Sequence, residues 1–193
     1  MNRLAPPPVR HLYDDALAVL LAYAAPDAIQ EQLRRGFLNA LAADPMAVSK
    51  QGPPSHLTAS CLVLSEDGGS VLLHLHAKAR MWLQFGGHLE TEDAGVSAGA
   101  AREAREESGL STLDVREKPL DLDRHALGAR FGDCAEHLDI RYLATAPAAA
   151  LAQASSESLA VQWFPVDALP PQVGPDLPRL IAVGRQRLAA EAG

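Results

Sequence analysis

The chain has 193 residues, a formal net charge of −7 and 48% hydrophobic residues. This size and composition fit one globular domain with an extension, and they exclude a disordered chain. The acidic balance argues against nucleic acid as a partner, because a phosphate backbone requires a basic surface. An anionic ligand would therefore need metal ions or a local group of Lys and Arg to offset the protein's charge.

The two cysteines, Cys61 and Cys134, are too few for a disulfide framework and form no Cys-x-x-Cys pair. We expect reduced thiols in a cytoplasmic protein. No apolar run reaches the length that spans a bilayer, so no membrane partner is expected. The apolar run 16–25 follows arginines as in a signal peptide, but Asp14 and Asp15 abut it and the pattern continues into a second helix. We interpret it as a helix.

Residues 1–55 predict a helical extension ahead of the main domain. Apolar residues recur at helical spacing over 13–23, and a second amphipathic helix is predicted over 26–42. The stretch DPMAVSKQGPP, 44–54, has the composition of a linker. This extension could cap a site, assemble a homodimer or merely pack against the rest of the chain.

Residues 56–193 predict an α/β domain. Strands are expected at 57–65, 70–78, 82–87, 137–145 and 159–169, and helices at about 93–108 and 177–192. The turn at 66–69 joins the first two strands into a hairpin. In the strand 137–145, we expect the alternating polar residues His137, Asp139 and Arg141 to face outward.

The helix 93–108 carries the densest group of acids, within the stretch REAREESGL. Asp93 is the expected N-cap and Gly109 the expected C-terminal cap. On a helix Glu103, Glu106 and Glu107 share one face, where like charges repel. Such a face is either solvated and laced with Arg–Glu pairs, or it holds cations such as Mg²⁺, which bind carboxylates and substrate phosphates.

The preceding glycines favour the cation site. Gly86 and Gly87 end a predicted strand, where the backbone can turn sharply and offer its polar groups to a ligand or metal. The segment GGHLETEDAGVSAGAAREAREESGL, 86–110, resembles the signature of the Nudix hydrolases. That signature is Gly, five residues, Glu, seven residues, then Arg-Glu-hydrophobic-x-Glu-Glu-x-Gly-hydrophobic. The second half matches fully, whereas the first half has Asp93 in place of Glu and one extra residue before Arg102.

The resemblance covers about residues 56–190 and implies a Nudix-type α/β/α sandwich with a mixed sheet. It also implies a hydrolase that uses Mg²⁺ or Mn²⁺ to cleave the diphosphate bond of a nucleoside diphosphate linked to another moiety. The alternative is a catalytically weak Nudix-like domain that binds a nucleotide or acts in regulation. Such domains usually lose the glutamates that this chain keeps.

The resemblance also implies roles for individual residues. The expected metal ligands are Glu103, Glu106, Glu107, Glu157 and the backbone of Gly87. In some relatives, a Glu six residues before a Trp on a late strand approaches the metals, and Glu157 lies six residues before Trp163 in the same way. Glu157 is therefore also a candidate for the general base, and Glu136 is the other candidate. Arg102 would support the site by pairing with Asp93 or Glu90.

The remaining candidates would contact substrate: His88, Glu90, His137, Arg141, Lys78 and Arg80. Alternatively, the histidines are surface residues or hydrogen-bonded residues of a strand. The alternative for Lys78, Arg80 and Arg141 is that their side chains are simply exposed to solvent. Trp82 could stack on a base or belong to the core. We expect no zinc site, because none of the histidines has metal-ligand spacing together with cysteines.

Overall fold

A computed structural model describes residue 6 and residues 9–128, 132–155 and 158–193. Its elements run in the order α1 (Arg10–Ala22), α2 (Ala28–Ala43), the 3-10 helix η2 (Pro45–Val48), β1 (Ser55–Ser65), β2 (Ser70–His76), β3 (Trp82–Leu83), β4 (Phe85–His88), α3 (Val96–Ser108), β5 (Asp114–Val115), β6 (Asp121–Ala126), β7 (Glu136–Ala146), β8 (Ser158–Pro165) and α4 (Leu177–Glu191). The predicted strands and helices are therefore present, with shifted ends. No helix of the described residues is long and apolar enough to cross a membrane.

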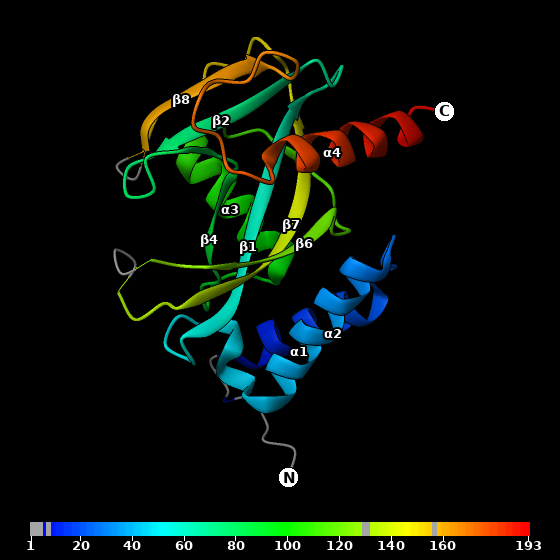
Figure 1. Cartoon of the computed structure of the whole chain (residues 1–193), viewed down its shortest axis with the longest axis vertical. Coiled ribbons are helices and arrows are strands. Elements are labelled where there is room, and N and C mark those ends of the chain that lie inside the picture. Colours follow the sequence, from blue (N-terminus) through cyan, green and yellow to red (C-terminus); the bar gives the residue numbers. More distant parts are fainter. Residues whose placement is uncertain (1–5, 7–8, 129–131, 156–157) are drawn as a thin grey trace.

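The described strands form one eight-stranded mixed sheet (Figure 1). The long strands β1 and β7 are parallel neighbours at its centre, and the remaining pairs are antiparallel. The order β3-β2-β1-β7-β5 is completed by β4 on β1, β6 on β7 and β8 on β2. The α/β class with a mixed sheet, as expected from the sequence, is confirmed.

Helices cover both faces of this sheet. Alternate β1 residues, including Ala59 and Val63, belong to a core with Ala100 and Ala104 of α3. The intervening residues Leu62 and Leu64 pack with α4 in a second core. Because both faces of β1 and β7 are covered, these strands are buried along nearly their whole length.

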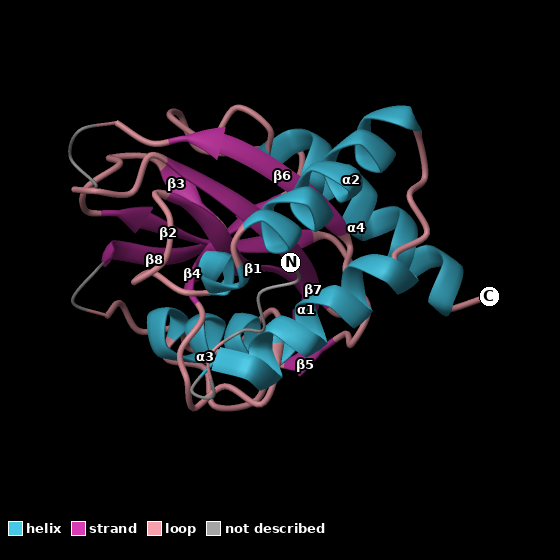
Figure 2. Cartoon of the chain, turned by 90° about the horizontal axis from the view of Figure 1, so that it is seen from below, coloured by secondary structure: helices cyan, strands magenta, loops and turns pink. Residues whose placement is uncertain are grey.

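The helical hairpin α1–α2 packs against the sheet domain (Figure 2). Leu12, Leu20 and Phe37 are fully or almost fully buried and join the same core as α3 and β1. The side chain of Gln30 is buried and bonds to both backbone groups of Leu122 on β6, at 2.9 and 3.0 Å. These paired hydrogen bonds fix α2 against the sheet.

The linker predicted at 44–54 is more ordered than its composition indicated. Pro45–Val48 form a 3-10 helix, and Ala47 and Val48 are fully buried. The outward orientation expected for β7 polar residues is wrong for Asp139 and Arg141, which are 3% and 2% exposed. The alternation holds, but the polar side of β7 faces other buried polar groups, not solvent.

The N-cap expected at Asp93 is also wrong. The helix α3 begins at Val96, and the side chain that meets its first turn comes from α1. The Asp15 carboxylate accepts a hydrogen bond from the Val96 backbone N–H at 2.7 Å. Gly95 makes room for it, because a Cβ there would lie 2.6 Å from Asp15 Oδ2. The extension thus supplies the negative charge that stabilises the N-terminus of the acidic helix.

We predict that Asp15→Ala lowers the free energy of unfolding by about 0.5–2 kcal/mol, the range measured for lost caps. In a chain of this size the melting temperature should fall by about 1–8 °C. Asp14→Ala is the matched control, since Asp14 is an exposed neighbour on the same helix. Thermal unfolding of both variants is the measurement, and equal melting temperatures would contradict the capping role.

Candidate active site

The acidic face of α3 lies against the glycine pair of β4. Glu107 is only 4% exposed, and its carboxylate accepts a hydrogen bond from the Gly86 backbone N–H at 2.9 Å. Glu103 is partly buried one turn earlier, whereas Glu106 is exposed. The face therefore extends from a buried carboxylate to a solvated one, rather than forming a uniformly exposed surface.

The two glycines of β4 make room on its two sides. A Cβ on Gly87 would lie 2.6 Å from Glu103 Oε1, and one on Gly86 would lie 2.4 Å from the Ser60 Cβ on β1. Gly87 therefore leaves room for a carboxylate against its backbone, and Gly86 leaves room for the neighbouring strand. Carboxylate oxygens beside a bare backbone form the oxygen donor set that hard divalent cations prefer.

Arg102 holds the carboxylates and the preceding loop together. Its guanidinium donates two hydrogen bonds to Asp93, at 2.9 and 3.1 Å, so the pairing predicted between these residues is present. The same group bonds to Glu103 at 3.0 Å, to Glu106 at 3.1 Å and to the His88 carbonyl at 2.9 Å. Burial alone would lower the pKa of Arg102, but the hydrogen bonds to Asp93 and the charge of Glu103 outweigh it and raise the pKa.

His74 is a neighbour of Glu107 whose contact the sequence did not indicate. It is 1% exposed, and its Nδ1 lies 2.8 Å from Ser158 Oγ and 3.4 Å from Glu107 Oε1. Burial, together with the charge of the nearby His76, lowers the pKa of His74 to about 4. The ring is therefore neutral at pH 7, so an imidazolium does not offset the charge of Glu107 there.

A pocket of about 360 Å³ opens on the other side of β4. Its wall includes Gly86, Gly87 and His74, the groups that contact Glu103 and Glu107 from behind. Pockets of this volume accommodate small molecules. A ligand bound here would contact the backbone of the glycine pair, whose other side faces the carboxylates.

Arg141 lines the same pocket but is enclosed by acids. Its guanidinium pairs with Asp139 at 3.2 Å, Asp123 at 2.9 Å and Asp121 at 3.5 Å, and also with Asp176. Asp139 in turn accepts hydrogen bonds from two hydroxyls of β1. The sequence predicted that the positive charge of Arg141 would attract an anionic substrate, but four carboxylates of the protein already surround this charge.

The other predicted residues have contacts of their own or are exposed. Glu136, at the start of β7, pairs with Arg124 at 2.7 Å and accepts a hydrogen bond from Ser55. Glu90 is exposed, 3.8 Å from Arg102. Lys78 and Arg80 are exposed in the β2–β3 connection. Glu157 lies outside the described residues.

Trp82 and two predicted substrate histidines have other surroundings. Trp82 packs edge-on against Phe164 within the α4 core, in agreement with the core alternative. The side chains of His88 and His137 lie together with His56, and their ring centroids are 5.1–5.4 Å apart. His137 also borders the pocket.

Comparison with known proteins agrees with this architecture. The NUDIX domain family model matches residues 54–183. A NUDIX-family hydrolase from Clostridium perfringens is similar with 23% identity and a TM-score of 0.54, over 70% of this chain and 97% of that chain. A C. elegans Ap4A hydrolase is similar with 17% identity and a TM-score of 0.56, and the match covers 69% of this chain and 98% of that chain.

A third similar structure is the NUDIX domain of Shewanella oneidensis NrtR complexed with ADP ribose. It has 19% identity and a TM-score of 0.52, and the match covers 68% of this chain and 87% of that chain. At such identities the likeness shows the fold alone. A search of curated proteins finds no match. The family model nevertheless spans most of the chain and includes the glycine pair and the acidic helix, so the chain belongs to the Nudix hydrolase family.

Proposed function

We propose that this protein is a metal-dependent hydrolase that cleaves the diphosphate bond of a nucleoside diphosphate linked to another moiety. The observation that carries the proposal is the contact of the acidic α3 face with the Gly86–Gly87 backbone, at the wall of a pocket. Glu103, Glu106, Glu107 and the Gly87 carbonyl would hold Mg²⁺ or Mn²⁺. When bound, these ions neutralise phosphate charge and acidify a water molecule.

The reaction is a displacement at phosphorus. The water oxygen forms a bond to one phosphorus of the diphosphate, and the bond from that phosphorus to the bridging oxygen breaks. The bridging oxygen leaves with the second phosphate, and the water proton passes to a carboxylate. Glu107 is held by the Gly86 N–H and by its burial, so its oxygens are already positioned before substrate binds.

Arg102 acts as a positioning residue. All its hydrogen-bonding nitrogens are engaged by Asp93, Glu103, Glu106 and a carbonyl, so it orients the ligands and does not reach substrate. The shorter Asp93 side chain still forms a two-point contact with it, despite the extra residue in the loop. The altered first half of the motif therefore retains its supporting contact.

The general base that accepts the water proton is predicted to be one of two acids, Glu136 or Glu157. Glu136 would have to release Arg124, whose hydrogen bond lowers the pKa of that carboxylate and weakens it as a proton acceptor at neutral pH. Glu157 precedes β8, the strand whose Ser158 contacts His74 beside Glu107. That position in the chain favours Glu157.

The substrate class rests on the pocket and on the relatives. The pocket lies behind Gly86 and Gly87, so a substrate with its diphosphate at the carboxylates could place a second group there. The similar structures include an Ap4A hydrolase and a domain complexed with ADP ribose. Both compounds carry phosphate chains between two larger groups. His88, His137, Glu90, Lys78 and Arg80 remain candidates for contacting the substrate.

The alternative is a domain that binds such a nucleotide without turning it over. The kept glutamates and the Arg102 network favour the hydrolase. A direct test is a screen of nucleotide sugars, dinucleotides and nucleoside di- and triphosphates with Mg²⁺ or Mn²⁺, in which coupled phosphatase converts the products to inorganic phosphate. Metal-dependent turnover supports the hydrolase, whereas nucleotide binding without turnover supports the alternative.

We predict that Glu107→Gln lowers kcat by about 10²–10⁴-fold, because the neutral amide cannot replace the buried charge. The substitution keeps the shape and one oxygen that can accept from Gly86, so the circular dichroism spectrum and melting curve should stay close to wild type. Glu117→Gln is the matched control, because Glu117 is exposed and outside the α3 face. Near-normal activity of the Glu107 variant would refute the assigned role.

We further predict that Gly87→Ala raises the Mg²⁺ concentration needed for half-maximal activity by about 10-fold or more. The new Cβ would displace the Glu103 carboxylate, its nearest neighbour at 2.6 Å. Gly36→Ala controls for the added methyl, since nothing lies within 4 Å of a Cβ there. Metal titrations of initial rates compare the two, and an unchanged Mg²⁺ dependence would show that Glu103 need not approach Gly87.

A further inference from the structure

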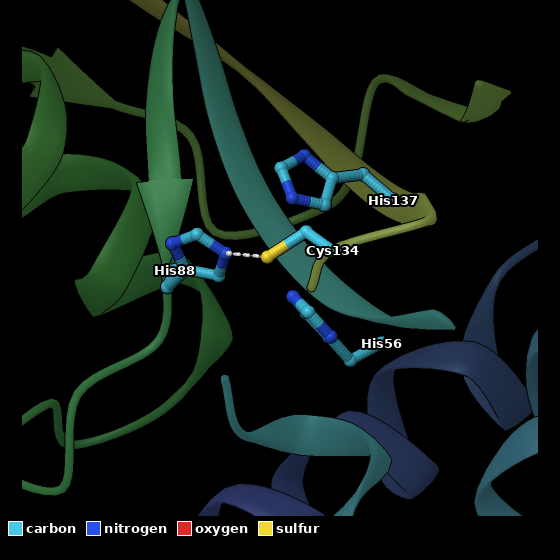
Figure 3. A group of neighbouring side chains, drawn as sticks. All are labelled: His56, His88, Cys134 and His137. Atoms are coloured by element: carbon cyan, nitrogen blue, oxygen red, sulfur yellow. Dashed lines mark hydrogen bonds between the residues drawn. The ribbon is translucent and has the colours of Figure 1, made fainter. Parts of the chain in front are cut away.

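Four metal-ligating side chains that take no part in the proposed bond cleavage converge at one end of the sheet (Figure 3). Two of them, His88 and His137, are also candidates for contacting substrate, a role that binding a metal ion would replace. His56 lies near the start of β1, His137 near the start of β7, and His88 ends β4. Cys134 lies in the connection just before β7. His56 and His137 are direct partners in the parallel β1–β7 register, and Thr58 pairs with His88 two residues along β1. The topology thus unites residues that are far apart in sequence.

The donor atoms are close enough to share one ion. One ligand atom from each of the four residues lies within 4.8 Å of all the others, and His88 Nε2 is 3.8 Å from Cys134 Sγ. A tetrahedral zinc site with usual bond lengths separates its donors by about 3.3–3.7 Å. Small side-chain rotations would close the remaining difference.

Two of these nitrogens are buried without a partner. His56 is 1% exposed, and neither its Nε2 nor the Nε2 of His137 meets a hydrogen-bonding group among the described residues. Buried polar atoms are almost always paired, so such a pair of orphaned nitrogens at one place needs an explanation. A metal ion between them would provide it.

The second nitrogen of His56 is oriented as in a metal-binding histidine. Its Nδ1 lies 2.8 Å from the Pro53 carbonyl, which can only accept, so Nδ1 carries the proton. The lone pair is then on Nε2, which faces the group. A backbone carbonyl that fixes the tautomer in this way is the usual outer contact of a histidine ligand.

We propose that His56, His88, Cys134 and His137 bind one Zn²⁺ ion in a closed tetrahedral site. Three imidazole nitrogens and one thiolate match the ligand preference of zinc, and four protein ligands leave no open position, as in structural sites. Cys134 would release its thiol proton on binding. The ligands are nitrogen and sulfur donors without a carboxylate, so this site is chemically distinct from the acidic α3 face and does not depend on the proposed hydrolysis.

The zinc would fasten the β6–β7 connection to three strands. Cys134 comes from that connection, and the histidines come from β1, β4 and β7. His137 and residues 125–128 line the pocket behind the glycine pair. Zinc would therefore hold one wall of the proposed substrate pocket in place, although it does not contact the reacting groups.

Metal analysis of the full-length purified chain tests the site. After expression with zinc and dialysis against metal-free buffer, we expect about one zinc per wild-type chain and nearly none in Cys134→Ser. Because loss of an outer contact alone weakens binding by about 10–100-fold, loss of the thiolate should exceed about 100-fold in a competition titration. Cys61→Ala removes the other cysteine, which is buried elsewhere, and should keep the zinc.

Cobalt substitution reports which ligands are used. Co²⁺ in the wild type and in Cys61→Ala should show a thiolate-to-cobalt charge-transfer band and the strong visible bands of tetrahedral coordination. Cys134→Ser should lack the charge-transfer band, and His56→Ala should lose the tetrahedral spectrum. Glu107→Gln should leave both features unchanged, because its carboxylate belongs to the other site.

Three results would overturn the proposal. The first is a folded wild-type chain that neither retains zinc nor develops the thiolate band when titrated with Co²⁺. The second is zinc retained by folded Cys134→Ser at the wild-type level. The third is zinc lost in Glu107→Gln and kept in Cys134→Ser, which would assign it to the acidic helix. Circular dichroism of each variant establishes that it is folded.

Discussion

The close approach of α3 to β4 is the constraint on which the rest of the site depends. It requires glycine at 87, because a side chain there would meet the Glu103 carboxylate, whereas Gly86 leaves room for Ser60 of β1. Once the helix lies this close, the Gly86 N–H can hold Glu107, and Arg102 can reach both the carboxylates and the loop that leads into the helix. Repulsion between three acids on one face is thereby offset by groups on both sides of the helix.

Local patterns predicted most of the elements. Alternation and helical spacing gave the longer strands and the helices within a few residues but missed β5 and β6, and Gly109 ends α3 in the left-handed conformation with φ of 70°. The pairing of Arg102 with Asp93 was expected from the family resemblance, not from a local pattern. What local patterns missed depends on tertiary neighbours. Polar and apolar residues alternate along β7 as predicted, but alternation alone does not show whether the polar side is covered by other parts of the protein. Asp139 and Arg141 are therefore buried although the pattern predicted exposure. Likewise, the His56, His88, Cys134 and His137 group has no spacing signal, because three different strands assemble it.

The N-terminal extension shows the same limit. Its helices follow from amphipathic spacing, yet no local pattern indicates that Asp15 would cap a helix far along the chain. The His11 ring also contacts the Asp93 carbonyl at 2.9 Å, so α1 touches both the loop before α3 and its first turn. The segment outside the family match therefore stabilises the helix that carries the acids, in place of the N-cap that Asp93 would have provided. Asp93 is instead committed to Arg102.

Two adjacent residues of β4 face the two proposed metal sites. Successive strand residues face opposite sides of a sheet, so Gly87 faces the α3 carboxylates and His88 faces the imidazoles of β1 and β7. Oxygen donors favour hard ions such as Mg²⁺, whereas imidazole and thiolate favour Zn²⁺. The His88 carbonyl accepts from Arg102, so one backbone segment supports both groups. Because the donor sets differ so strongly, each proposed site would select its own ion although the two lie next to each other. A zinc ion behind the strand would then not compete for the carboxylates in front of it.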